Sequence, residues 1–147
     1  MDSMLIALSD SMSSKAVLEY VLAMAWCPES VQVTLLHVFR KQSGGEALMG
    51  QKYMKKQPAR YMEVLEQARD RFVEKGVPPQ NITLLMVTEP YDTIADGIID
   101  QARRVNPSLV VIGRKRMSKA EEFVLGDASI KLVRALEGMA VLVVKVN

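Results

Sequence analysis

The chain has 147 residues, 49% of them hydrophobic and 24% charged, with a formal net charge of +2, which predicts one globular domain over residues 1–147. So small a net charge does not indicate a nucleic-acid binder, and no apolar run approaches the roughly 20 residues that span a bilayer. The single cysteine, Cys27, excludes an internal disulfide and is expected to be a packed thiol, and the absence of a secretory signal at the start favours a cytoplasmic location.

Five short apolar runs alternate with helical patterns along the chain. In chain order they predict a strand at Met4–Leu8, a helix at Lys15–Trp26, a strand at Val31–Val38, a helix from Pro58 to Gly76, a strand at Asn81–Thr88, a helix from Asp92 to Val105, a strand at Leu109–Gly113, a helix at Gly126–Leu136 and a strand at Ala140–Val146. Near-continuous apolar strands joined by helices indicate a parallel sheet that is covered on both faces. We therefore predict an α/β fold with an open, doubly wound sheet of five parallel strands.

The helix limits are set by residues that start or stop a helix. Pro58 suits a first turn, Asp92 can cap the third helix, and Gly76 and Gly138 suit left-handed stops. Residues 40–57, with three glycines and several like charges, are expected to form a mobile loop. The residues expected to face the core are Val17, Tyr20, Val21 and Met24 in the first helix, Met62, Leu65, Ala68 and Phe72 in the second, Ile94, Ile98, Ala102 and Val105 in the third, and Ile130, Val133 and Leu136 in the fourth.

A basic segment follows the fourth predicted strand. Residues 113–129 read GRKRMSKAEEFVLGDAS, with four basic residues close together at the start. In an open doubly wound sheet, ligands bind beyond the carboxyl ends of the strands, where the strand order reverses. If the first strand is central, this segment and residues 9–14 face the same crevice. The basic cluster then lies beside the ligand position that the fold predicts.

The sequence resembles the universal stress protein family over essentially its full length. The matching stretches are LIALSDSMSSKAVLEY, LLHV, LVVIGRKR and VLVVKV, in that order. The resemblance implies the strand order 3-2-1-4-5 and a homodimer formed through the last strand, at Val141–Val144. It also implies that many members bind ATP in the crevice described above.

ATP-binding members carry G-x-x-G, nine further residues, and then G followed by Ser or Thr. Gly113 and Gly126 match the first and third glycines, whereas Arg116 replaces the second glycine and Asp127 replaces the hydroxyl residue. Ser129 matches a further hydroxyl position. The binding positions that the resemblance implies are Ala7, Leu8, Ser9, Val38, Ile112, Gly113, Arg116, Gly126, Asp127 and Ser129.

The substitutions within these positions change the expected chemistry. A carboxylate at Asp127 repels a phosphate 4 Å away by about 1 kcal/mol in water and about 4 kcal/mol at an effective dielectric constant of 20. Asp127 can instead cap the last helix and occupy the N–H groups that a phosphate would use. Arg116 can bind a phosphate through its guanidinium group. In the first loop, Ser9 replaces an aspartate near the adenosine, and Val38 falls where the family backbone meets the adenine.

Two functional hypotheses follow from these residues. The first is a homodimeric cytoplasmic stress-response protein that acts on an unidentified protein partner, without enzymatic activity or a strongly bound cofactor. The second is an ATP-binding member that uses Arg116 and Lys119 for phosphate, with slow hydrolysis. A phospho-receiver domain is excluded, because the acidic pair and the phosphoacceptor aspartate of that class are missing. The only histidine, His37, is expected to be a hydrogen-bonded structural residue, and we assign no metal site and no catalytic residue.

Overall fold

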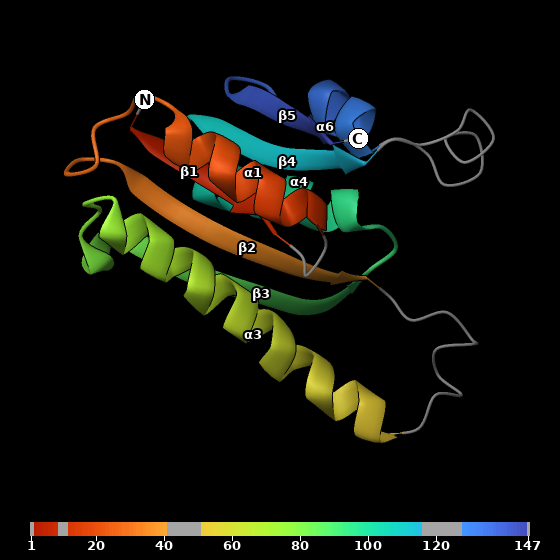
Figure 1. Cartoon of the computed structure of the whole chain (residues 1–147). Coiled ribbons are helices and arrows are strands. Elements are labelled where there is room, and N and C mark those ends of the chain that lie inside the picture. The colour runs from red at the N-terminus through yellow and green to blue at the C-terminus, as the bar shows by residue number, and fades with distance from the viewer. Residues whose placement is uncertain (1, 9–11, 41–50, 116–127, 147) are drawn as a thin grey trace.

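The computed structural model describes residues 2–8, 12–40, 51–115 and 128–146 (Figure 1). The elements in chain order are β1 Ser3–Ala7, α1 Met12–Ala23, β2 Gln32–Arg40, α3 Gln51–Glu74, the 3-10 turn η1 Pro79–Asn81, β3 Ile82–Tyr91, α4 Ile94–Val105, β4 Leu109–Lys115, α6 Ala128–Ala135 and β5 Ala140–Val146. The strands form one parallel sheet in the order β3-β2-β1-β4-β5. The predicted fold class and strand order are confirmed.

The central position of β1 in the sheet accounts for its apolar residues on both faces. Met4 aligns with Val33 of β2 on one side and with Leu109 of β4 on the other. Because helices cover both faces of the sheet, the consecutive residues Met4, Leu5 and Ile6 are all buried, whichever face they point to. The continuous apolar run that predicted this strand is therefore a direct consequence of its position in the sheet.

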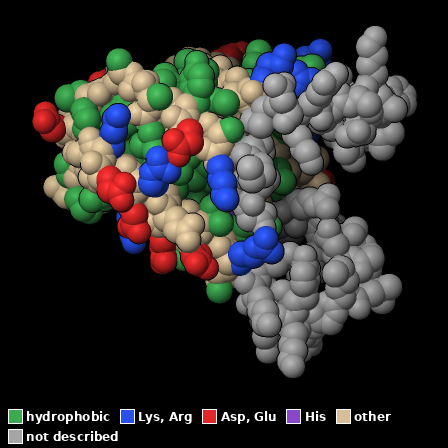
Figure 2. All heavy atoms as spheres, viewed as in Figure 1, with side chains coloured by type: hydrophobic (Ala, Val, Ile, Leu, Met, Phe, Trp, Pro, Cys, Tyr) green, Lys and Arg blue, Asp and Glu red, His purple; other side chains and the backbone are tan. Residues whose placement is uncertain are grey.

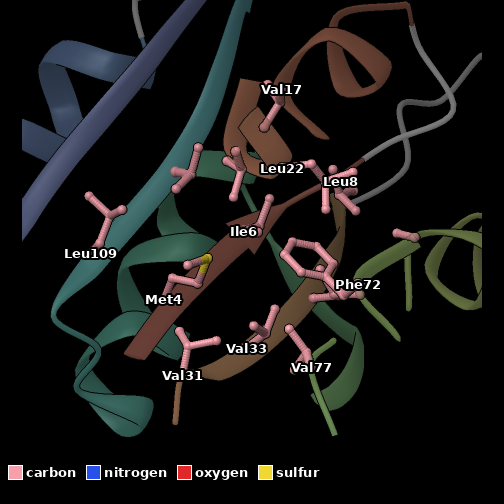
Figure 3. Close-up of a cluster of buried hydrophobic side chains, with 14 of the residues drawn as sticks. Met4, Ile6, Leu8, Val17, Leu22, Val31, Val33, Phe72, Val77 and Leu109 are labelled. Atoms are coloured by element: carbon pink, nitrogen blue, oxygen red, sulfur yellow. The ribbon is translucent and has the colours of Figure 1, made fainter. Parts of the chain in front are cut away.

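Two apolar clusters hold the helices to the two faces. Side chains of α1 and α3 pack with Met4 and Ile6 of β1 on one face, and Figure 3 shows Val17 and Phe72 converging on this cluster. Side chains of α4 and α6 pack on the other face, around Leu5 of β1. Figure 1 shows α1 and α3 in front of the sheet and α4 behind it. The prediction of helices on both faces is thus confirmed.

The start of α3 corrects the predicted loop at residues 40–57. Arg40 ends β2, residues 41–50 lie outside the described residues, and residues 51–57 are helical. Pro58 consequently lies inside α3 and not in its first turn. The segment before it, QKYMKKQ, consists largely of strong helix formers. A proline inside a helix removes one backbone donor and crowds the carbonyl four residues earlier, so α3 continues through Pro58 against a local cost of about 3 kcal/mol.

Several residues that were expected to face the core are exposed. Helix α6 turns Ser129 and Leu132 inward in place of the predicted Ile130 and Val133, whereas Leu136, just after the helix, is buried as predicted. Helix α1 buries Leu22 beside the predicted Val17 and Val21. The predictions that proved wrong concern Tyr20, Ile94, Val105, Ile130 and Val133, each of which is more than a third exposed.

The start of α4 also differs from the prediction. Thr93, and not Asp92, is the N-cap, because its hydroxyl oxygen accepts a hydrogen bond from the Asp96 backbone N–H at 3.1 Å. Gly76 and Gly138 have φ values of 106° and 77°, as expected for left-handed stops. Cys27 is exposed, and so the packed thiol is another wrong prediction.

Candidate functional site

The strand order reverses between β1 and β4, and the carboxyl ends of these strands define the candidate crevice. Ala7 and Leu8 lie at the end of β1, and Ile112 and Gly113 lie in the second half of β4. Val38, near the end of β2, lies at the same edge of the sheet, because Ala7 is aligned with Leu36. Six of the predicted binding positions are described, and Ser9, Arg116, Gly126 and Asp127 lie outside the described residues.

The end of β1 is anchored by a buried histidine. The Leu8 backbone N–H donates to the Leu36 carbonyl at 2.8 Å, and the Leu8 carbonyl accepts from His37 Nδ1 at 2.8 Å. The His37 ring stacks on Tyr61 of α3, with the ring centroids 3.8 Å apart. The expectation of a hydrogen-bonded structural histidine is confirmed. The backbone that leads to Ser9 is therefore tied to both β2 and α3.

Helix α4 approaches the end of β2 so closely that only glycine fits at position 97. A Cβ atom on Gly97 would lie 2.3 Å from Val38 Cγ1 and 2.9 Å from Tyr91 Cδ2. The Val38 side chain is therefore packed directly against α4, with 4% of its surface exposed. Glycine inside a helix is less stable than alanine by about 1 kcal/mol, so a glycine in a predicted helix often has a packing reason. Gly97 was therefore the one sign of this close approach that the sequence carried.

Polar contacts of two basic side chains, Lys131 and Arg103, hold α6 against α4. Near the start of α4, the Lys131 ammonium lies 2.7 Å from Asp96 Oδ1 and donates to Thr93 Oγ1 at 3.3 Å. This hydrogen-bonded ammonium, followed by the Thr93 hydroxyl, lowers the pKa of the Asp96 carboxyl. At the other end, Arg103 Nη2 donates to the Ala135 carbonyl at 3.2 Å. Helix α6 is thus held against α4 near its middle and at its last residue, and Ser129 is buried in its first turn.

Tyr91 organises a polar cluster where β3 ends. Its hydroxyl donates to Asp100 Oδ2 at 2.5 Å and accepts from Gln101 Nε2 at 3.3 Å. The Tyr91 hydrogen bond, followed by the charge of Arg104, lowers the pKa of the Asp100 carboxyl. Sequence reasoning missed this cluster, because no local pattern connects a strand end with residues nine and ten positions later.

Two hollows on the described surface lie away from the crevice. In a sheet of this type the helices run against the strand direction, so their carboxyl ends lie near the amino edge of the sheet. One hollow separates the final turns of α1 and α3, where Glu19 and Arg71 form an ion pair at 2.6 Å. The other lies between the final turns of α4 and α6. Figure 2 shows the mixed acidic and basic side chains of the α1 and α3 face.

The described part of the chain offers little for metal or membrane chemistry. It contains no group of three histidine, cysteine, aspartate or glutamate residues that could hold a metal ion. None of its helices is both long and apolar enough to cross a bilayer. Arg114 lies near the carboxyl end of β4, beside the crevice.

Comparisons with known proteins agree with this architecture. UspA, a universal stress protein from Lactobacillus plantarum, is 15% identical, with a TM-score of 0.71 over 97% of this chain and 96% of that chain. A universal stress protein in complex with cAMP is 18% identical, with a TM-score of 0.65 over 97% of this chain and 95% of that chain. An Arabidopsis thaliana family protein with AMP bound is 19% identical, with a TM-score of 0.65 over 100% of this chain and 93% of that chain. No curated protein matches the chain.

Identities this low show a common fold and nothing finer. A family model provides the stronger finding, because it matches residues 1–145, almost the whole sequence. The chain belongs to the universal stress protein family.

Proposed function

We propose that the chain is a cytoplasmic, homodimeric stress-response protein that acts by binding another protein and binds ATP only weakly. The observation that carries this proposal is a family-type crevice with two changed motif residues, Arg116 and Asp127. Gly113 and Ser129, which match the family motif, lie in the second half of β4 and in the first turn of α6. These two matches support a crevice of the family type, and Arg116 and Asp127 are the two motif positions that differ from the ATP-binding members.

Asp127 is the substitution with the clearest physical effect. It immediately precedes α6 in the sequence, where a phosphate would use the positive end of the helix and its N–H groups. A carboxylate at this position repels phosphate and competes for the same donors. The repulsion grows with the charge of the ligand, so ATP is disfavoured more than AMP or cAMP.

The open edge of β5 supports the homodimer. Within the described residues, β5 pairs with β4 on one side only, and its sequence AVLVVKV has no proline. A row of unpaired N–H and C=O groups on an apolar edge favours pairing with another chain. Members of the family are commonly dimeric. We propose that two copies pair antiparallel through Val141–Val144 across a two-fold axis.

A second candidate function is nucleotide binding at the same crevice. Two structures similar to this chain contain cAMP and AMP. Arg114 and Lys115 end β4, and Arg116 and Lys119 follow in the sequence, so basic groups that could offset Asp127 are close to the motif. In this case Arg116 and Lys119 bind phosphate, and the protein hydrolyses ATP slowly.

Release of bound nucleotide and calorimetry distinguish the two functions. The purified protein, once denatured, should release no stoichiometric nucleotide, and titration with ATP should show weak binding. Asp127→Ser combined with Arg116→Gly should tighten ATP binding about thirtyfold if about 2 kcal/mol of repulsion is removed. Asp127→Ser alone should give most of this gain, because the repulsion acts directly on the ligand.

The matched control is Asp70→Ser, which removes the same charge from the exposed surface of α3. It should leave the affinity for ATP unchanged. Stoichiometric ATP in the original protein, together with weaker binding after Arg116→Gly, would instead identify the arginine as a phosphate ligand. That result would establish the second function in place of the first.

A further inference from the structure

Strand β3 forms an edge of the sheet that the proposed homodimer leaves open. Within the described residues it pairs with β2 on one side only, and Figure 1 shows it at the end of the sheet opposite β5. Residues Ile82–Thr88, which we call the β3 edge, read ITLLMVT, and Glu89 and Pro90 come only after them. Edge strands are commonly protected by charged residues or prolines, because an unpaired row of backbone groups binds other chains. The β3 edge has neither kind of protection.

The hydrogen bonds of β2 show which residues of β3 point their backbone groups outward. In a parallel sheet, successive residues of a strand bond to opposite neighbours. The Leu8 N–H donates to the Leu36 carbonyl at 2.8 Å, so Leu36 bonds to β1 and the preceding residue, Leu35, bonds to β3. Because Leu35 is aligned with Leu84, its hydrogen bonds go to the residues on either side of Leu84. The backbone N–H and C=O of Leu84, and of every second residue from it, therefore point away from the sheet.

These outward groups determine what kind of molecule can bind to the β3 edge. The N–H groups of Leu84, Met86 and Thr88 point outward, whereas the Ile82 N–H already donates to the Pro79 carbonyl. Successive outward groups lie two residues apart, or about 6.6 Å. Only an extended backbone presents donors and acceptors at this spacing, as in complexes where a peptide adds a strand to a sheet. The backbone of β3 therefore fits a strand from another chain.

On one face of the sheet, a flank of α3 lies beside the β3 edge. The inward direction of α3 is set by three buried side chains: Leu65, Ala68 and Phe72. With about 100° between successive helical residues, Arg71 lies about 90° to one side of this direction, and Met62 and Val73 lie about 90–110° to the other. Arg71 pairs with Glu19 of α1, so Met62 and Val73 lie on the flank away from α1. Since α1 packs on β4 and β5 and α3 packs on β2 and β3, that flank points past β3.

This flank offers apolar contacts along the length of the β3 edge. Met62 and Val73 are about 16 Å apart along the helix, close to the length of about 20 Å that Ile82–Thr88 spans. Val73 is 37% exposed, and Arg69, which lies between the two, pairs with Asp70 at 3.8 Å. The side chains of β3 that pack on this face are apolar and only partly buried: Ile82, Leu84 and Met86. A strand added to the β3 edge would therefore contact apolar groups on this face.

On the other face, the neighbouring flank of α4 is polar. Asp96 and Arg103 turn toward α6, and Gln101 lies about 160° around the helix from Arg103, on the side away from α6. Gln101 Nε2 donates to the Tyr91 hydroxyl at 3.3 Å, and that hydroxyl donates to Asp100 Oδ2 at 2.5 Å. The two faces beside the β3 edge thus differ in polarity. Because successive side chains of a strand point to opposite faces, a strand that suits both faces alternates apolar and polar residues.

We propose that the β3 edge binds an extended segment of a partner protein as an added strand, with its apolar side chains toward α3 and its polar side chains toward α4. The inference deepens the proposed binding of another protein and rests on it. A second copy of this chain is a poorer occupant. If copies paired through β5 and also through β3, each copy would have two neighbours, and the assembly would grow into an open filament unless its symmetry closed it.

Selection from a phage-displayed library of random eight-residue peptides, with the full chain as the target, tests the proposal. The enriched peptides should alternate apolar and polar residues, and one of them is then synthesised with a fluorescent label and titrated with the protein. Thr88→Pro should weaken its binding about tenfold, because it removes an outward N–H without breaking the ladder to β2. The matched control is Thr88→Val, which keeps the N–H at the same exposed position and should bind the peptide as the original protein does.

A second pair of variants tests the contact with α3. Val73→Glu should weaken binding of the same peptide about fivefold, because it places a carboxylate beside the apolar side chains of the added strand. Val105→Glu is the control, since Val105 is 38% exposed and lies at the end of α4 on the opposite face of the sheet, and its affinity should not change. Circular dichroism and thermal unfolding should show that all four variants keep the original fold.

Three results would overturn the inference. Enriched peptides without alternation, or a library that yields none, would show that the β3 edge does not bind strands of the proposed kind. Equal affinity of the peptide for Thr88→Pro and Thr88→Val would place its binding on another surface, and the proposed binding of a protein would still stand. Filaments of the original protein that Thr88→Pro prevents would identify a second copy as the occupant. The release of bound nucleotide tests the proposed function independently of all three.

Discussion

Gly97→Ala tests whether the close approach of α4 to the end of β2 is necessary. The added Cβ atom would lie 2.3 Å from Val38 Cγ1, 2.9 Å from Tyr91 Cδ2 and 3.1 Å from Val38 Cγ2. Distances below 3 Å between such atoms are not tolerated, so either α4 or the Val38 side chain must move. Val38 is buried in a packed cluster and has little free space to move into.

The expected magnitude follows from two opposing effects. Alanine in place of glycine inside a helix gains about 1 kcal/mol from conformational preference. Overpacking of a filled core typically costs about 1–3 kcal/mol, and several short contacts place this site at the upper end. We therefore expect Gly97→Ala to lower the free energy of unfolding by about 1–2 kcal/mol. In a domain of this size, that change lowers the melting temperature by about 2–4 °C per kcal/mol.

A double-mutant cycle measured by urea unfolding identifies the cause. Val38→Ala removes both methyl groups that the new Cβ atom would meet. The double variant Gly97→Ala/Val38→Ala should be less destabilised than the sum of the two single variants, by about 1 kcal/mol or more. If Gly97→Ala alone stabilises the protein, or if the two changes are strictly additive, α4 is not held against Val38 and the close approach of α4 to the end of β2 is refuted.

Two further predictions concern polar contacts near the sheet edge. His37→Leu should lower the free energy of unfolding by about 1–3 kcal/mol in urea titrations, because it deprives the buried Leu8 carbonyl of its donor. His37→Asn keeps a side-chain donor and should lower the free energy of unfolding by less. Equal losses in the two variants would argue against the hydrogen bond. Tyr91→Phe should raise the pKa of the Asp100 carboxyl towards its ordinary value in a carbon-13 NMR titration, with Arg104 retaining part of the shift. The pKa of Asp100 is lowered in the folded state, so its stabilising effect is present above the unfolded pKa and is lost as pH falls through the folded value. The part of the stability difference between Tyr91→Phe and the original protein that comes from Asp100 should therefore begin to shrink below about pH 4.

The sheet could be predicted from the sequence because each strand carries its signal locally. β1 and β4 are apolar at every core position, and that pattern follows from burial on both faces. The strand order came from the family resemblance, since periodicity alone does not tell which strands are neighbours. The helix stops at Gly76 and Gly138 were predictable because a left-handed backbone has a strong preference for glycine.

The faces and starts of the helices were harder to predict, because neighbours in space decide them. Ile130 and Val133 have helical spacing, but Leu132 and Leu136 fit the space over the sheet, and a short helix has too few residues for the pattern to choose between them. Thr93 and Asp92 are both good N-caps, and the backbone path after β3 selects the threonine.

The candidate site was predictable only in outline. The reversal of strand order between β1 and β4 identifies the carboxyl edge of the sheet as the ligand position. The motif glycines Gly113 and Gly126 identify the segment after β4 as the one that faces it. The hydrogen bond between His37 and Leu8 joins residues 29 positions apart, and the contact of Lys131 with Thr93 joins residues 38 positions apart. Such contacts depend on tertiary packing and leave no local pattern.

The central position of β1 has a consequence for how the chain folds. β1 meets β2 after a single intervening helix, but the backbone N–H of Ser108, just before β4, reaches the Ser3 side chain across 105 positions. Closing a loop of that length lowers the chain entropy before the contacts between β1 and β4 can stabilise the sheet. The β1–β4 half of the sheet should therefore form slowly. Until it forms, β1 is an apolar strand with one unpaired edge. The protein should therefore be most prone to aggregation early in refolding, before β4 docks.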